Sequence, residues 1–157
     1  MLPLKADCQT LYETDYLQWI ETTVEKLQSQ DYLNVDWETL IEEIEDMGRS
    51  ERRSFESNLI VVLLHLLKWQ YQPECRSGSW ESSIIEHRRR VKKALNESPS
   101  LKPYFESIIA ECYAEAVKQA RAETGLPIAT FPSQCPYELA KVTDDAFLPQ
   151  TGKTETA

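Results

Sequence analysis

Four carboxylates close together in the first third of the chain are the best candidates for metal chemistry: Glu42, Glu43, Glu45 and Asp46. On a helix, carboxylates three or four residues apart lie on one face, where they can hold a hard divalent cation. Here Glu43 and Glu45 flank the apolar face of the predicted helix, while Glu42 and Asp46 point away from it. Neither histidine follows a Glu three residues earlier, so the di-iron pattern of helix bundles is absent. We therefore expect solvated or ion-paired acids and no cofactor; the alternative is a Mg or Mn site made by Glu42, Glu45, Asp46 and His65.

A polar stripe crosses the most apolar stretch of the sequence, and His65 lies at its centre. A buried histidine must find partners for its ring nitrogens, because an unpaired buried donor or acceptor costs ~1–3 kcal/mol. The stripe therefore predicts either a structural, hydrogen-bonded histidine or a site that binds a ligand. A stripe that simply faces water would have the same pattern. Its members are Ser54, Asn58, His65, Lys68 and Gln72.

Basic residues are concentrated between positions 87 and 93. On a helical wheel Arg88 falls near the apolar face, where a guanidinium needs a partner, and we predict an ion pair with Glu45. The basic residues on the outward side of this helix could contact phosphate. However, the sequence has no motif that reads a DNA groove and no run of aromatic residues for base stacking, and its net charge is -9. We therefore expect charge balance within the protein and no binding of nucleic acid. The outward set is Arg89, Arg90, Lys92 and Lys93.

The charges form three blocks along the chain. Residues 1–48 hold 12 acids and 2 bases, residues 49–102 hold 6 acids and 11 bases, and the remainder holds 8 acids and 4 bases. In one compact domain such blocks are expected to neutralise each other across helix contacts. The alternative is a basic surface for an anionic partner.

Several functional classes lack their signatures. The sequence has no G-x-G-x-x-G, P-loop, G-x-S-x-G or H-E-x-x-H motif. Its four cysteines stand far apart, so neither a zinc knuckle nor a disulfide framework is indicated. The first 30 residues do not resemble a secretory signal, and the longest apolar stretch falls short of the ~20 residues of a spanning helix. We expect a cytoplasmic protein without a membrane span.

Apolar residues recur every three or four positions through most of the chain, which predicts amphipathic helices. Gly48 either separates the second helix from the third or kinks one continuous helix. Gly125 is the expected stop of the fifth, since glycine tolerates the left-handed conformation. The predicted helices cover about 11–27, 37–47, 50–71, 79–96 and 101–124.

The region after Gly125 is rich in proline, which predicts an extended segment wrapped around the helices, with one short helix over about 136–142. No internal repeat and no alternation typical of strands is present. The expected fold is therefore all-α, a single-domain bundle of about five helices over 8–149. Residues 150–157 are expected to be a disordered tail.

Five motifs prompt a family assignment. In chain order they are Glu42-Glu43-Ile44-Glu45-Asp46-Met47-Gly48, His65-Leu66-Leu67-Lys68-Trp69, Arg76-Ser77 with Ser79-Trp80, Pro99-Ser100-Leu101, and Phe131-Pro132 with Cys135-Pro136. Together they resemble the domain of unknown function 29 family, which is abundant in cyanobacteria, over about Tyr12 to Pro149. The resemblance implies an all-helical, stand-alone bacterial domain. It transfers no catalytic residue.

The residues favour a small protein that acts by binding a protein or a small molecule. The predicted site is a polar pocket or patch where the second, third and fourth helices meet. In it Glu45 and Arg88 form an ion pair, His65 and Lys68 face the ligand, and aromatic walls complete the site. The alternative is a metal-dependent hydrolase or nuclease that uses the carboxylates and His65. The full set of predicted site residues is Glu42, Glu45, His65, Lys68, Trp69, Trp80 and Arg88.

Overall fold

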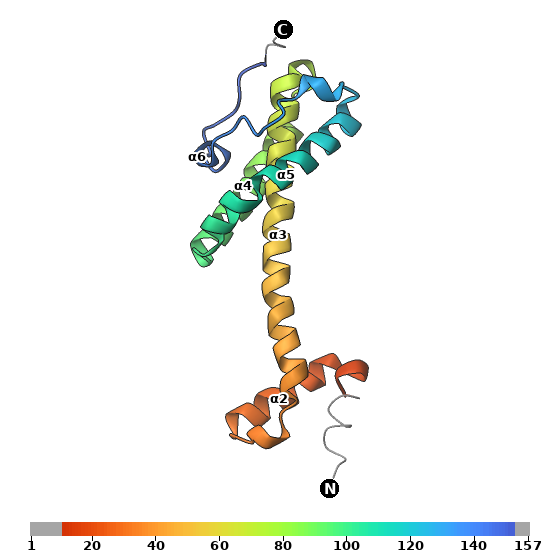
Figure 1. Cartoon of the computed structure of the whole chain (residues 1–157), viewed down its shortest axis with the longest axis vertical. Coiled ribbons are helices and arrows are strands. Elements are labelled where there is room, and N and C mark those ends of the chain that lie inside the picture. Colours follow the sequence, from red (N-terminus) through yellow and green to blue (C-terminus); the bar gives the residue numbers. More distant parts are fainter. Residues whose placement is uncertain (1–10, 153–157) are drawn as a thin grey trace. The chain divides into compact units, whose positions relative to one another are not determined.

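The computed structural model describes residues 11–152, and within that range every regular element is a helix (Figure 1). The predicted all-α fold class is confirmed. Residues 8–10 of the predicted domain and 153–157 of the predicted tail lie outside the described residues. The α-helices are α2 (Tyr16–Gln28), α3 (Trp37–Tyr71), α4 (Gly78–Glu97), α5 (Leu101–Thr124) and α6 (Leu139–Val142), with 3-10 turns at Tyr32–Asn34, Pro73–Cys75 and Ile128–Thr130.

The helices expected over 37–47 and 50–71 are one helix, α3. Gly48 lies in its interior without a positive φ, and a Cβ built on it would meet no atom within 4 Å. An interior glycine costs only ~1 kcal/mol relative to alanine, so good helix formers on both sides carry the helix across it. The first proline after Trp37 is Pro73, two residues beyond the end of α3.

The all-α chain clusters into two compact units, with the boundary inside α3 between Ser50 and Glu51. The first unit contains α2 and the beginning of α3. Asp15 caps α2, since its carboxylate accepts a 3.0 Å hydrogen bond from the backbone N–H of Gln18. Among residues 11–50 of this unit the buried apolar side chains are Trp19 and Val35, and the threonines Thr23 and Thr39 are buried as well.

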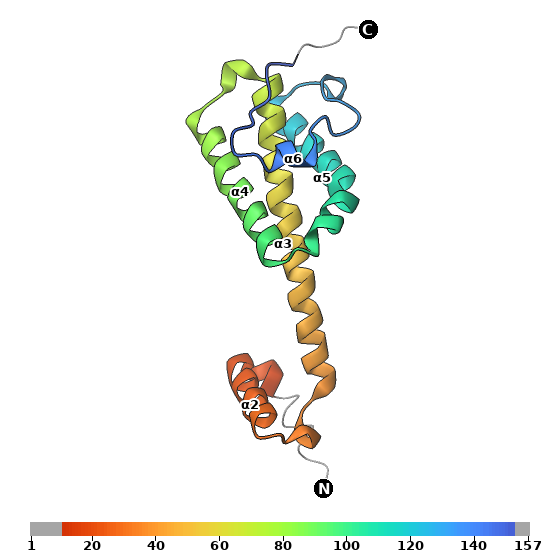
Figure 2. The same cartoon turned by 90° about the vertical axis from the view of Figure 1, so that its left-hand side faces the viewer.

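The second unit has the larger core. The second half of α3 runs between α4 and α5 (Figure 2), and its apolar side chains are almost completely buried. Phe55 of α3 meets Phe105 of α5 edge to face, with 5.6 Å between ring centroids. The stripe predicted on α5 is also buried, including Cys112, Ala116 and Ala120. The periodicity of 3.6 residues therefore identified the packing faces of both helices.

The proline-rich segment after Gly125 packs on the second unit. The hydroxyl of Tyr113 donates to the carbonyl of Pro132 at 2.6 Å, and the hydroxyl of Tyr137 donates to Oε1 of Gln70 at 2.7 Å. The backbone N–H of Gly152 donates to the Gln70 carbonyl at 3.0 Å. The short helix expected over 136–142 is α6, and it begins three residues later than expected, at Leu139.

Candidate functional site

Arg88 holds the C-terminal segment through backbone carbonyls. Its side chain is 1% exposed, and Nε donates to the carbonyl of Val142 at 2.8 Å, while Nη2 donates to the carbonyls of Phe147 at 3.1 Å and Lys141 at 3.4 Å. These carbonyls are the hydrogen-bond partners of the Arg88 guanidinium, and the Glu45–Arg88 ion pair stays a prediction. Carbonyl groups at and after the end of α6 therefore accept the hydrogen bonds of the guanidinium.

The carboxylates of α3 do not form the predicted metal site. Glu45 and Asp46 are paired with Arg49, at 3.9 and 2.5 Å. Asp46 and His65 stand about five turns apart in α3, which is too far for shared coordination. In the described part of the chain no three His, Cys, Asp or Glu side chains are grouped so that they could hold a metal ion. The alternative site of Glu42, Glu45, Asp46 and His65 is therefore not formed.

Lys68 and Trp80 do come together, and α5 contributes a third residue. Lys68 Nζ lies 2.7 Å from Oε2 of Glu123 and 4.4 Å from the centre of the Trp80 ring. Lys68 is nearly buried, so the carboxylate and the aromatic face compensate its charge in a poorly solvated place. Sequence periodicity gave no indication of Glu123, because it lies 55 residues further along the chain.

His65 is half-buried beside this group. Its Nδ1 lies 2.9 Å from the Val61 carbonyl, one turn earlier in α3. Burial lowers the pKa of His65, because a charged imidazole is poorly solvated there, and the positive charge of Lys68 adds to the effect. The ring is therefore held by a local hydrogen bond, as a structural histidine would be. Trp69 also contacts a cation: Arg76 lies over its ring at 5.1 Å and donates from Nε to its carbonyl.

The outward-facing basic residues of α4 are paired with nearby acids. Glu86 accepts from both Arg89 and Arg90 at 2.9 Å, and this holds the pKa of its carboxyl at about 2. Lys92 pairs with Asp145 at 2.6 Å, and Lys93 with Glu97 at 3.6 Å. The ion pairs of Arg89, Arg90 and Lys93 lie within α4, whereas that of Lys92 joins α4 to the C-terminal segment. The acids of α3 play no part in these ion pairs.

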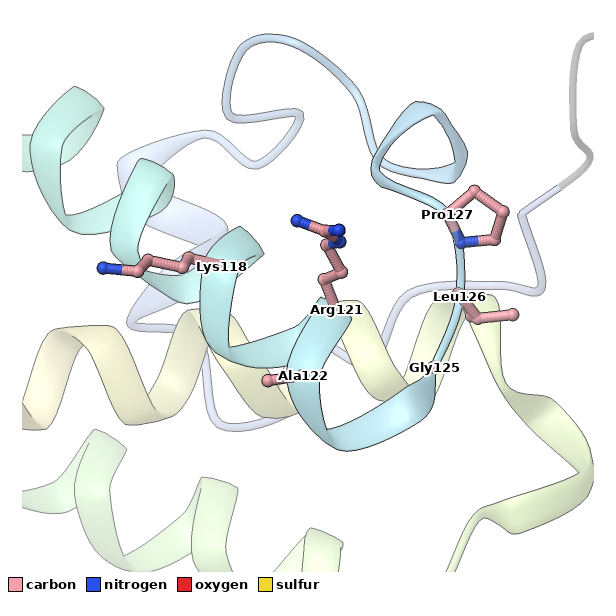
Figure 3. Close-up of a pocket in the computed structure, with 6 residues that line it drawn as sticks. All are labelled: Lys118, Arg121, Ala122, Gly125, Leu126 and Pro127. Carbon is pink, nitrogen blue, oxygen red and sulfur yellow. The ribbon is translucent and has the colours of Figure 1, made fainter.

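A surface pocket of about 560 Å³ lies at the C-terminal end of α5. Figure 3 shows Lys118 and Arg121 on successive turns of α5, with Leu126 and Pro127 on the segment that follows. Lys118 is 4.0 Å from Glu115, so part of the positive charge is compensated. None of the predicted site residues lines this pocket.

The first unit exposes a continuous apolar stripe. Ile41 is 53% exposed, Ile44 59% and Met47 67%, and Trp37 is also exposed one turn before Ile41. Positions 37, 41 and 44 follow the helical repeat and so lie on one face of α3. On α2, Leu17 and Val24 are exposed two turns apart. We call the four exposed side chains of α3 the apolar surface of the first unit: Trp37, Ile41, Ile44 and Met47.

A different face of α3 binds the preceding helices. Glu43 accepts hydrogen bonds from the hydroxyls of Tyr12 and Tyr16, the second at 2.6 Å, and both phenols have raised pKa values, about 12 for Tyr12. Tyr12 and Tyr16 also contact the buried Trp19, with ring centroids 5.1 and 6.0 Å away. The aromatic cluster therefore packs beside Glu43. The stripe from Trp37 to Ile44 lies about 100° or more around the helix from Glu43 and stays uncovered.

Comparison with known proteins agrees with the resemblance seen in the motifs. A family model described as domain of unknown function DUF29 matches residues 11–148. The chain belongs to the DUF29 family. No curated protein and no solved structure matches it.

Sequence reasoning did not identify the main exposed feature of this DUF29 protein. The residues Ile41, Ile44 and Met47 were expected to form the inner face of a bundle helix, and their spacing gave no sign that this face would be bare. The one available signal was composition, since residues 37–47 mix apolar side chains with five acids and contain no Lys or Arg. No helix within residues 11–152 is long and apolar enough to span a membrane.

Proposed function

We propose that this DUF29 protein is a protein-binding module whose partner covers the apolar surface of the first unit. The observation that carries the proposal is the exposure of Ile41 and Ile44 on a single face of α3. Isolated exposed apolar residues are common, whereas large contiguous apolar patches on a soluble surface mark interaction sites. Burial of each isoleucine by a partner stabilises a complex by up to ~1.5–3 kcal/mol before the costs of association.

The polar stripe around His65 supports binding less well. Lys68 is engaged by Glu123 and Trp80, and His65 by the Val61 carbonyl. A ligand would have to replace these interactions or add to them. The ligand-facing roles of His65, Lys68, Trp69 and Trp80 therefore stay predictions, as does the expectation that nucleic acid is not a partner.

Site-specific photo-crosslinking tests the proposal. A benzophenone amino acid is placed at Ile44 or, in a matched control, at Ile85, which is equally exposed at 59% but lies on α4. Irradiation of cells that express the full chain is followed by denaturing electrophoresis and mass spectrometry of any adduct. We expect a discrete adduct with another polypeptide from position 44 and none from position 85. The absence of an adduct at position 44, or the same adducts from both positions, would contradict the proposed function.

A further inference from the structure

We infer that the partner presents a basic amphipathic helix to the apolar surface of the first unit. This inference rests on the proposed function and specifies the chemistry of the partner. It is argued from the spacing of the exposed apolar side chains and from the charges beside them.

The spacing fits a helix as the bound element. Trp37, Ile41 and Ile44 are four and three residues apart, and Met47 lies three further on, so the stripe extends over about 15 Å along the α3 axis. A partner helix of about three turns, with apolar residues at the same intervals, covers a stripe of that length. Two helices that pack in this way bury both apolar faces at once.

The charges beside the stripe select a basic partner. Glu38 and Glu45 are exposed and lie within about 60° of Ile41 on the helical wheel, and Glu42 is exposed one row further around. Residues 11–50 hold eleven acids and two bases, Lys26 and Arg49. Arg49 pairs with Asp46 and, at 3.9 Å, with Glu45, so the acids of this part of the chain remain in large excess. A helix with Lys or Arg beside its apolar residues therefore complements this surface.

The same charges disfavour the other possible occupants. A second copy of this surface would bring the carboxylates of Glu38 and Glu45 against their equivalents, which costs free energy. Nucleic acid and anionic lipid both present phosphate, and an acidic rim repels it. Membrane-surface helices carry Lys and Arg on the polar face, opposite to the pattern of α3.

Peptide titration of the full chain tests the partner chemistry. The probe is a fluorescein-labelled 18-residue peptide of Leu and Lys with helical spacing, and binding is followed by anisotropy. Two control peptides are used: one with Glu in place of Lys, and one with the Leu and Lys in scrambled order. We expect the basic amphipathic peptide to bind at least about tenfold more tightly than either control.

Variants of the protein locate the site. Ile41→Ser with Ile44→Ser should weaken binding of the basic peptide at least about tenfold, because two buried apolar contacts are lost. Ile85→Ser is the matched control and should leave binding unchanged. The double substitution Glu38→Gln and Glu45→Gln should weaken binding of the basic peptide. It should also make the affinity less sensitive to an increase in ionic strength above ~0.15 M. All these positions are exposed, so each variant should keep its helices, which circular dichroism checks.

Several outcomes would overturn the inference. Tight binding of the acidic peptide that depends on Ile41 and Ile44 would agree with a protein-binding surface but contradict a basic partner. A second outcome is that the basic peptide binds the Ile41→Ser, Ile44→Ser variant as tightly as the unchanged protein, and a third is that the scrambled peptide binds as tightly as the basic amphipathic one. Either of these two results would show that charge attraction alone causes the binding. A crosslinked adduct at twice the chain mass, identified as a second copy, would keep the proposed function and overturn this inference.

Discussion

The Nε–H of Arg88 donates a hydrogen bond of 2.8 Å to the carbonyl oxygen of Val142, 54 residues further along the chain. The same guanidinium reaches the carbonyls of Lys141 and Phe147, so one side chain of α4 fixes both ends of the turn that follows α6. This relationship makes Arg88 the main polar link between α4 and the C-terminal segment.

Replacement of Arg88 by Met should therefore destabilise the protein strongly. The change removes the donor of the Val142 and Phe147 carbonyls in a poorly hydrated place, whereas the Lys141 carbonyl keeps the N–H of Asp144, and the expected loss in the free energy of unfolding is about 2–4 kcal/mol. Urea unfolding followed by circular dichroism measures it. The neighbouring Arg89 is exposed and pairs with Glu86, so Arg89→Met should change stability little. Equal effects of the two substitutions would contradict the assigned role of Arg88.

The pKa of His65 predicts a pH dependence of stability. Because burial lowers this pKa below 6.5 in the folded protein, the unfolded chain binds a proton more readily. The contribution is fully present above about pH 6.5, and it is lost as the pH falls from there toward the lowered folded pKa. His65→Gln should flatten this part of the pH profile of the free energy of unfolding. In NMR, the imidazole signal assigned to His65 should titrate below pH 6.5; a higher midpoint would contradict the prediction.

Gly48 offers a test of the continuity of α3. Since a Cβ at this position meets nothing within 4 Å and its φ is not positive, Gly48→Ala should stabilise the helix by about 0.5–1 kcal/mol. Gly125 provides the contrast, because its φ is +72° at the end of α5, and Gly125→Ala should destabilise by about 1 kcal/mol. Thermal unfolding compares the two. Destabilisation by Gly48→Ala would indicate a break in α3 at this glycine.

The contact between Lys68 and Glu123 should appear as a coupling energy. A double-mutant cycle with Lys68→Ala and Glu123→Ala isolates the pair, and we expect about 0.5–1 kcal/mol because Glu123 is half-exposed. Lys68→Ala alone should cost more than Glu123→Ala alone, since it also removes the contact with the Trp80 ring. A coupling of zero would mean that Lys68 is available to a ligand, as the sequence had suggested.

Much of the fold follows from the sequence alone. The repeat of apolar residues predicted the packing faces of the second half of α3 and of α5, since a helix with such a stripe must bury it. The same reasoning left open whether Gly48 breaks a helix, because the propensity cost of one glycine is small beside the contribution of its neighbours. The motifs also indicated the DUF29 family, which the match over residues 11–148 confirms.

The tertiary structure alone decided the partners and the exposure of the candidate site. Periodicity shows that one face of a helix is apolar, but it does not show what covers that face, so the sequence could not distinguish the buried Leu59 from the exposed Ile44. Likewise, the position of Arg88 on its helix indicated that the guanidinium needs a partner, and only the structure shows that the carbonyls of residues 141, 142 and 147 accept its hydrogen bonds. Local spacing is set by the geometry of one helix. Contacts between residues far apart in the chain depend on how the helices pack, and that information is not local.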